Sequence, residues 1–229
     1  MFSLCTLVVV SADVLNIPPG DINSLSMQWQ TTLMDRFYSP KSKVERADYF
    51  KNAPLRDYCK WESVWCVDGK VVRVDRIDLH DKVLDIHLLP PTVVAIRLTK
   101  CSLRYALHTR ALPRALKYCF VSNNRLFGSV GLRTLPEHLV SLDLSINRLV
   151  GPVDLTELPR NLLTLSLWNN RIRQSVVFFG QLPPNLEYIC LKFAGEDNQI
   201  GELRGTFTEN VERLGKMFRG IPLEHIHIE

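Results

Sequence analysis

Apolar residues recur in a fixed pattern through the middle of the chain. A Leu-Pro pair begins at positions 89, 112, 135, 158 and 182, so successive pairs are 23, 23, 23 and 24 residues apart. Three to four residues after each pair comes an apolar-x-x-apolar-x-apolar segment; the five are Val93/Ile96/Leu98, Leu116/Cys119/Val121, Leu139/Leu142/Leu144, Leu162/Leu165/Leu167 and Leu186/Ile189/Leu191. An earlier, shorter unit begins at Val74, Ile77 and Leu79. A fixed period of this length predicts a repeat protein, in which each unit contributes one short strand and buries its apolar residues against its neighbours.

A polar position keeps the same phase. Asn124, Asn147 and Asn170 each lie three residues after the last apolar residue of a segment and two before another apolar residue. This arrangement resembles the leucine-rich-repeat template L-x-x-L-x-L-x-x-N-x-L. A buried Asn amide has donors and an acceptor that can satisfy the backbone where the chain leaves the strand, so we expect an asparagine ladder. Cys101 takes this slot in one repeat, whereas the last repeat carries about four extra residues before Ile200, which should bulge outward.

The predicted fold is therefore an α/β solenoid: a right-handed leucine-rich-repeat superhelix with a parallel β-sheet on its concave face. We expect a short arc of about six repeats with a helical N-terminal cap. Six strands at about 4.8 Å spacing give a sheet roughly 25–30 Å across. The Gly-x-Val-x-Leu segments at 128–132 and 151–155 should fill the return side.

The ends of an open solenoid need caps, because the terminal repeats would otherwise expose their core. We expect an N-terminal cap over residues 13–70, with a helix around 25–37, and repeats over 71–205. Residues 206–229 should form a C-terminal cap, with an amphipathic helix over 206–219 and a strand over 223–228. Alternation on that strand explains the pair His225 and His227 better than a metal site does.

The end of the N-terminal cap carries a recognisable motif. Cys59-x-Trp61-x-x-Val64-x-Cys66, followed by Arg73-Val74-x-x-Ile77-Asp78-Leu79, resembles the N-terminal cap of plant-type extracellular leucine-rich-repeat proteins. Kinetoplastid surface-antigen repeat proteins have a similar cap and also favour Leu-Pro before each strand. The resemblance covers roughly residues 20–203, and departs from these families at Ser63, where they usually have Gly, and in the short first repeat. It implies a Cys59–Cys66 disulfide and a location outside the plasma membrane or in the secretory path.

The cysteines taken by themselves leave alternatives open. Cys59 and Cys66 could close a small disulfide loop or remain two reduced core residues. Cys101 and Cys119 occupy repeat positions that favour packing, whereas Cys190 lies between core positions and should face outward as a free thiol. No spacing of Cys and His indicates zinc, so we expect no metal and no cofactor.

The first dozen residues are also open to two interpretations. Residues 2–10 are an apolar run too short to span a bilayer, followed by Val10-Ser11-Ala12, which suits a signal peptidase. Residues 1–12 are therefore a candidate signal peptide, although no Lys or Arg precedes the run. The alternative is a buried terminal strand. No stretch of 18 apolar residues occurs, so we expect no membrane span.

Outward-facing strand positions predict the binding site. Tyr and Trp on a surface that packing does not require to be aromatic, with Arg nearby, are typical of protein-binding hot spots. The alternative is that the N-terminal segment covers these rings or that they pack on each other. The candidate residues are Arg76, Asp78, Arg97, Tyr118, Phe120, Asp143, Trp168 and Tyr188.

Composition and sequence motifs limit the classes of function that we expect for this protein. The net charge of +4 and pI near 8.8 are mildly basic, but Lys and Arg are spread along the chain. No phosphate-binding Gly-rich loop, G-x-S-x-G or H-E-x-x-H motif occurs, so we expect no enzyme activity. The leading hypothesis is a secreted or cell-surface module that recognises a protein or a glycan. The alternative is an intracellular (cytoplasmic) scaffold subunit; nucleic acid, through Arg97, Lys100, Lys117 and Arg125, is a weaker candidate partner.

Overall fold

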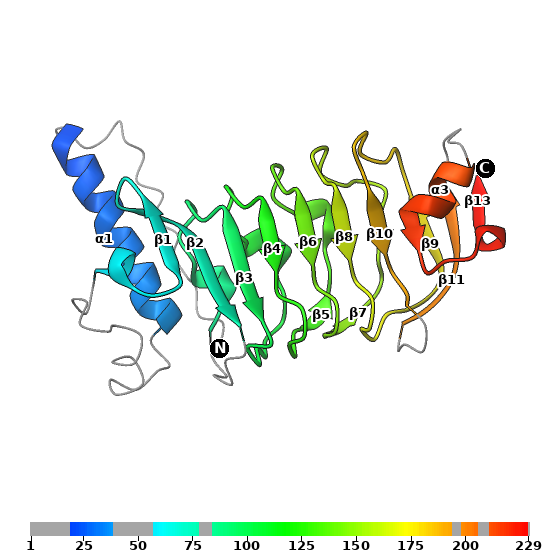
Figure 1. Cartoon of the computed structure of the whole chain (residues 1–229), viewed down its shortest axis with the longest axis horizontal. Coiled ribbons are helices and arrows are strands. Elements are labelled where there is room, and N and C mark those ends of the chain that lie inside the picture. The colour runs from blue at the N-terminus through cyan, green and yellow to red at the C-terminus, as the bar shows by residue number, and fades with distance from the viewer. Residues whose placement is uncertain (1–18, 39–56, 78–83, 194–197, 206–210, 229) are drawn as a thin grey trace, which may run out of the picture.

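Strands stack side by side along the whole length of the molecule (Figure 1). The structure is a computed structural model, which describes residues 19–38, 57–77, 84–193, 198–205 and 211–228. The candidate signal peptide therefore lies outside the described residues. The main sheet has eight strands in the order β1-β2-β3-β4-β6-β8-β10-β12. These are β1 (Val64–Val67), β2 (Lys70–Ile77), β3 (Ala95–Thr99), β4 (Tyr118–Phe120), β6 (Ser141–Asp143), β8 (Thr164–Ser166), β10 (Tyr188–Cys190) and β12 (Phe218–Arg219).

All strands from β2 onward pair in parallel, and only the first pairing, between β1 and β2, is antiparallel. The predicted parallel sheet of a leucine-rich-repeat solenoid is confirmed. The expected six strands were too few, because β1 is added at one end of the sheet and β12 at the other.

Each Leu-Pro pair lies where the return segment of one repeat ends and the chain turns toward the next strand of the main sheet. Short 3₁₀ helices η3 (Ile86–Leu88), η4 (Thr109–Ala111) and η5 (Leu132–Thr134) each stop just before one of these pairs. A residue that precedes proline is held in an extended conformation, and Leu89 has φ −70° and ψ 147°. The carbonyl of Pro90 then accepts a hydrogen bond of 3.0 Å from the Val93 amide, which turns the chain into the sheet.

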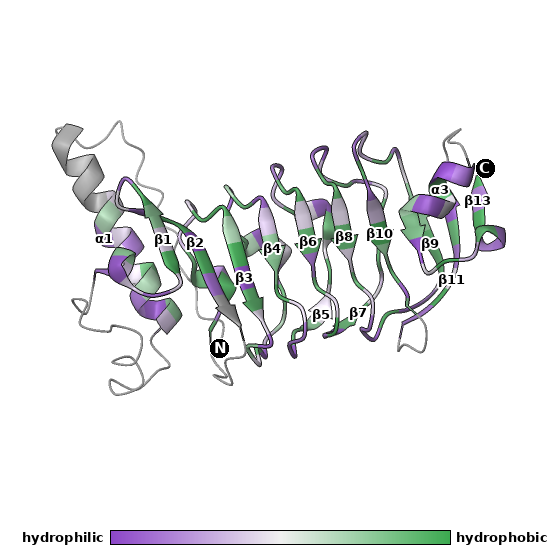
Figure 2. Cartoon of the chain, in the orientation of Figure 1, coloured by the Kyte–Doolittle hydropathy of each residue, from purple (hydrophilic) through white to green (hydrophobic). Residues whose placement is uncertain are grey.

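The core is a continuous apolar stack between the main sheet and the return side. Every apolar position of the five apolar-x-x-apolar-x-apolar segments is buried. Figure 2 shows hydrophobic and polar residues alternating along the strands of the main sheet. On the return side, parallel strands β9 (Arg173–Phe179), β11 (Gln199–Gly205) and β13 (Ile226–Ile228) form one sheet, while β5 (Phe127–Ser129) and β7 (Arg148–Val150) form another.

The N-terminal end is covered by helix α1 (Pro19–Tyr38), which contains the predicted helix and begins earlier. The amide of Gln30 donates to the Gly69 carbonyl (2.9 Å) and accepts from the Val71 amide (2.7 Å), so α1 is attached to β2. The predicted Cys59–Cys66 disulfide is present, which joins the 3₁₀ turn η2 (Tyr58–Lys60) to β1.

The C-terminal end differs from the prediction. Helix α3 spans Val211–Met217, and the expected residues 206–210 lie outside the described ranges; Phe218 and Arg219 form β12 in place of the expected last helical turn. Phe218 is buried against Phe179, with ring centroids 5.2 Å apart, so tertiary packing overrides the helical pattern. The expected strand over 223–228 is also shorter, because residues 223–225 form the 3₁₀ turn η6 (Leu223–His225) before β13.

Candidate functional site

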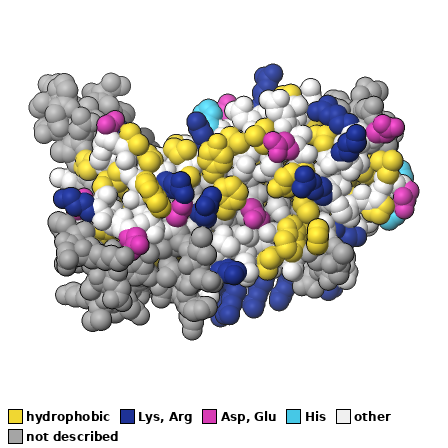
Figure 3. Space-filling model, viewed as in Figure 1, with side chains coloured by type: hydrophobic (Ala, Val, Ile, Leu, Met, Phe, Trp, Pro, Cys, Tyr) yellow, Lys and Arg dark blue, Asp and Glu magenta, His cyan; other side chains and the backbone are white. Residues whose placement is uncertain are grey.

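The outward surface of the main sheet is the candidate site, and we call it the sheet face. Backbone register arranges its side chains in two rows that cross the strands. The first row contains Trp65, Arg73, Ala95, Tyr118, Ser141, Thr164 and Tyr188; the second contains Asp75, Arg97, Phe120, Asp143, Ser166, Cys190 and Arg219. Figure 3 shows this face, where hydrophobic side chains are interrupted by basic and acidic ones.

The prediction for the first repeat was out of register. Val74 pairs with Ile96, so Asp75, and not Arg76, lies beside Arg97 in the second row. In the backbone register Arg76 pairs with Leu98 and not with a residue of the second row, and its part in binding stays a prediction. Asp78 lies outside the described residues. The error arose because Val74-x-x-Ile77-x-Leu79 imitates the repeat spacing, whereas Val71 and Val74 are the buried pair of this unit.

Three arginines lie over aromatic rings on the sheet face. The Arg73 guanidinium is 4.7 Å from the ring centre of Trp65, and that of Arg97 is 5.6 Å from Phe120. At the C-terminal end, Arg219 lies 4.0 Å from the Tyr188 ring centre. A cation over an aromatic face is attracted by the ring quadrupole. Arg73 and Arg219 were not among the predicted site residues, because the strand positions of β1, β2 and β12 were not recognised.

Two carboxylates lie in the second row among these cations. The Asp75 Oδ2 atom accepts hydrogen bonds from the Arg73 guanidinium, and its Oδ1 is buried without a partner among the described residues. The Asp143 Oδ1 atom accepts from the amide (3.0 Å) and hydroxyl (2.6 Å) of Ser145. The second row therefore begins with Asp75, Arg97, Phe120 and Asp143, so this surface presents both negative and positive charge to a partner.

The predicted aromatic residues are exposed to different degrees. Tyr118 is 41% exposed near the middle of the sheet, whereas Phe120, Trp168 and Tyr188 are half-buried. Trp168 packs against Phe193, with ring centroids 5.7 Å apart. The alternative, that these rings pack on other rings, applies to Trp168, and Tyr118 is the most accessible of the four.

Cys190 does not face solvent as a free thiol. It lies in the second row as predicted, but its side chain is buried and its Sγ lies 3.4 Å from the Lys192 carbonyl. Because β12 pairs with β10, Arg219 lies beside Cys190 and the thiol is no longer at an edge. Cys101 and Cys119 are buried as expected, and burial raises the pKa of the Cys119 thiol to about 12.

The three ladder asparagines satisfy the backbone below the sheet. The Asn147 side chain accepts from the Leu126 amide (3.0 Å) and donates to the carbonyls of Val121 and Leu144, each at 3.1 Å. Asn124 and Asn170 make the corresponding bonds in their repeats.

A fourth asparagine was missed. Asn198 accepts from the Ile172 amide (3.0 Å) and donates to the carbonyls of Leu167 and Leu191, each at 2.8 Å. The signal was available, since Asn198 precedes the apolar Ile200 by two residues, as in the other repeats, despite the insertion before it.

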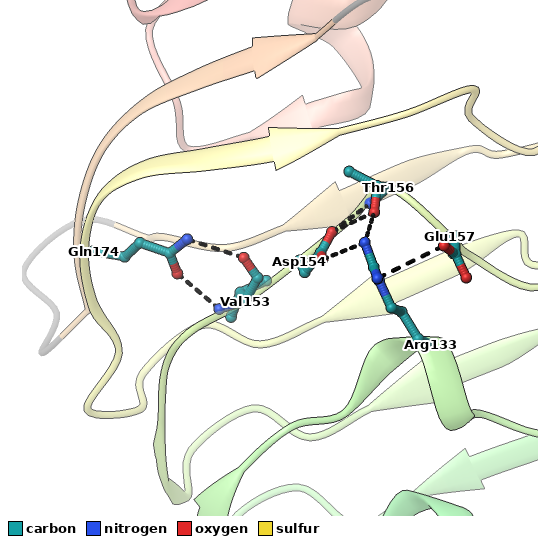
Figure 4. Close-up of polar contacts among 6 residues, drawn as sticks. All are labelled: Arg133, Val153, Asp154, Thr156, Glu157 and Gln174. Atoms are coloured by element: carbon teal, nitrogen blue, oxygen red, sulfur yellow. Dashed lines mark hydrogen bonds and ion pairs between the residues drawn. The ribbon is translucent and has the colours of Figure 1, made fainter.

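A polar cluster on the return side stabilises the fold there (Figure 4). The Gln174 side chain accepts from the Val153 amide (2.7 Å) and donates to its carbonyl (3.0 Å). Arg133 lies 2.9 Å from Asp154, whose pKa is lowered chiefly by the hydrogen bond from the Thr156 hydroxyl (2.6 Å). These groups pair with one another across neighbouring turns.

The structure describes no metal or membrane-spanning site. Within the described ranges, no three His, Cys, Asp or Glu residues gather as metal ligands. No helix in the same part of the chain has the length and apolar character needed to cross a bilayer.

Comparison with known proteins agrees with this geometry at the level of the fold. The chain is similar to the leucine-rich-repeat ectodomain of the receptor kinase SOBIR1 from Arabidopsis thaliana, with a TM-score of 0.52 and 19% identity over 75% of this chain and 95% of that one. The BIR2 ectodomain from the same plant gives a TM-score of 0.53 and 18% identity over 85% and 96% of the two chains. No protein-family model and no curated protein matches the chain. At this identity the similarity shows that the protein has the leucine-rich-repeat fold.

Proposed function

We propose that the protein is a recognition module that binds a protein ligand across its sheet face, secreted or on the cell surface. The observation that carries this proposal is the set of accessible aromatic residues and arginines at the N-terminal half of the sheet face. Tyr118 and Trp65 are 41% and 45% exposed, so packing of the core does not require an aromatic side chain at either position. Aromatic residues and Arg dominate binding energy at protein interfaces, and a nearly flat sheet suits a protein surface better than a small substrate.

Two further observations favour an extracellular setting. The Cys59–Cys66 disulfide is of the kind that persists in oxidising compartments. The two similar Arabidopsis proteins are described as ectodomains, one of them of a receptor kinase. A glycan ligand on the same face is the alternative occupant.

A binding screen with matched variants tests the proposal. Wild-type protein, Tyr118→Ala, Arg97→Ala and Phe178→Ala would be tested against an array of purified extracellular proteins and a glycan array. Phe178 is 52% exposed on the return side and serves as the control. We expect a protein that binds the wild type and Phe178→Ala equally, and binds Tyr118→Ala and Arg97→Ala at least tenfold more weakly. A ligand lost only with Phe178→Ala would contradict the proposal, and one found only on the glycan array would favour the alternative.

The location has its own test. The intact mass and non-reduced peptide map of the protein from its native cells should show a chain that begins at Asp13, with Cys59 bonded to Cys66. A chain that retains residues 2–12 and has both thiols free would support the intracellular scaffold.

A further inference from the structure

Three arginines stack along the edge of the solenoid where the chain leaves the main sheet. Arg125, Arg148 and Arg171 each follow a ladder asparagine directly, and all three are exposed. Backbone hydrogen bonds of 2.8 Å join each of their amides to the preceding turn, at Leu103, Leu126 and Leu149 respectively. We call these three residues the arginine edge; Figure 3 shows basic side chains in a row below β4, β6 and β8.

The spacing of the arginine edge follows from the repeat. The ladder asparagines hold successive turns in the same conformation, so equivalent side chains recur at the strand spacing of about 4.8 Å. Arg125 and Arg171 are therefore two turns of the solenoid apart, with Arg148 in the turn between them. Two more exposed arginines lie close to the row: Arg173 follows Arg171 by two residues in the same turn, and Arg104 lies in the turn before Arg125, which the Ala106–Phe127 bridge joins to it.

The charges of this row are not neutralised. None of the five arginines makes an ion pair or a side-chain hydrogen bond within the described part of the chain. Other arginines of the fold do have such partners, for example Arg133 with Asp154 and Arg204 with Glu202. Like charges held close together repel one another, and an anionic ligand that lies along the row would relieve this repulsion.

We infer that the arginine edge is a second binding surface, which takes a linear sulfated polysaccharide. A narrow row of guanidinium groups matches a chain of sulfates, which arginine can bind through two parallel hydrogen bonds. Phe127, 46% exposed, pairs with Arg148 across β5 and β7 and offers an apolar face to a sugar ring.

Other polyanions fit the row less well. Single-stranded nucleic acid is usually bound on several stacked aromatic residues, and this row has one. An anionic membrane presents a plane, whereas the guanidinium groups form a line. The Cys59–Cys66 disulfide also fits an oxidising compartment, where sulfated polysaccharides occur. This surface is separate from the sheet face, so the inference shares with the proposed function only the extracellular location.

Heparin, immobilised on a biosensor surface, is the probe. The variant Arg125→Gln/Arg148→Gln/Arg171→Gln is compared with Arg110→Gln/Arg114→Gln/Lys216→Gln, which removes the same charge from exposed positions elsewhere. At about 0.1 M NaCl we expect the first variant to bind at least tenfold more weakly and to lose about two to three units of salt-dependence slope. The control and Tyr118→Ala should stay within about threefold of wild type.

The inference is overturned if the first variant keeps wild-type affinity or if the charge-matched control loses as much. It is also overturned if phosphatidylserine vesicles or a single-stranded oligonucleotide bind the arginine edge more tightly than heparin does. Retention of heparin binding by Tyr118→Ala, with loss of a protein ligand, would separate this surface from the sheet face.

Discussion

Single side chains hold the turns of this solenoid in place. Asn147 satisfies one backbone amide and three carbonyls that water cannot reach. Asn147→Ala should lower the free energy of unfolding by about 3 kcal/mol, because buried backbone groups lose their partners. The measurement is urea denaturation, with the exposed Asn161→Ala as control; equal stability of the two variants would show that the ladder adds nothing.

The core leucines are expected to respond through packing. Leu142 and Leu165 are buried in neighbouring strands with 1% and 0% exposure. Leu142→Ala should cost about 2–5 kcal/mol by opening a cavity in a stack that cannot collapse freely. Denaturation should show the same loss for Leu165→Ala; a loss below 1 kcal/mol in both would contradict the continuous core.

His87 gives the fold a pH dependence. Its Nδ1 lies 2.7 Å from the Asp85 carboxylate and its Nε2 accepts from the His108 amide at 3.0 Å, so the ring is held neutral. Burial lowers the pKa of His87 and outweighs the attraction of Asp85, which raises it, while the nearby His108 lowers it further. Below about pH 6.5 the unfolded chain therefore binds a proton that the folded protein does not.

The free energy of unfolding should consequently fall as the pH decreases from about 6.5 toward the lowered pKa of His87. Above about pH 6.5, His87 should contribute nothing to the pH dependence of the free energy of unfolding. Denaturation between pH 7 and 5 measures this slope, which should be shallower in His87→Gln and unchanged in the exposed His138→Gln. An unchanged slope in His87→Gln would rule out this role.

At the scale of secondary-structure elements, a disulfide stabilises the segment from η2 to β1. Cys59 and Cys66 lie seven positions apart, and their disulfide restricts the unfolded chain. Cys59→Ser/Cys66→Ser should lower stability by about 2 kcal/mol in the chain-entropy account. The readout is thermal unfolding with and without a reductant. The reductant should destabilise the wild type and leave the double variant unaffected, and the reverse would mean that another thiol is involved.

The sequence predicted those elements whose position depends on local pattern. Leu-Pro pairs and the 23-residue spacing were enough to place β3, β4, β6, β8 and β10. The terminal strand β12 was missed because its partner β10 is distant in sequence, whereas β1 pairs with β2, the next strand along the chain. Phe218 leaves a helical pattern to pack on Phe179, and Arg76 follows the register that β3 imposes on β2. The candidate site inherited these errors, so Asp75, Arg73 and Arg219 were recognised only from the structure.

At the scale of the whole molecule, each repeat contacts mainly its neighbours. The stability of such a solenoid is approximately the sum of the stabilities of its repeats and of the interfaces between them. Removal of one whole repeat, which keeps the repeat pattern on both sides of the deletion, should therefore leave a shorter protein that still folds. Deletion of residues 124–146 joins Asn123 to Asn147 and preserves the pattern. We expect cooperative unfolding at a lower temperature by circular dichroism. Deletion of residues 124–136 breaks the phase and should prevent folding; equal behaviour of the two deletions would contradict the repeat account.

Recognition of a protein through the sheet face can be tested by photo-cross-linking. Benzoylphenylalanine would replace Tyr118 on the sheet face or Phe178 on the return side, in protein expressed by its native cells. We expect position 118 to form an adduct with one extracellular protein, identified by mass spectrometry, and position 178 to form none. An adduct from position 178 alone would contradict the claim and assign recognition to the opposite side of the solenoid.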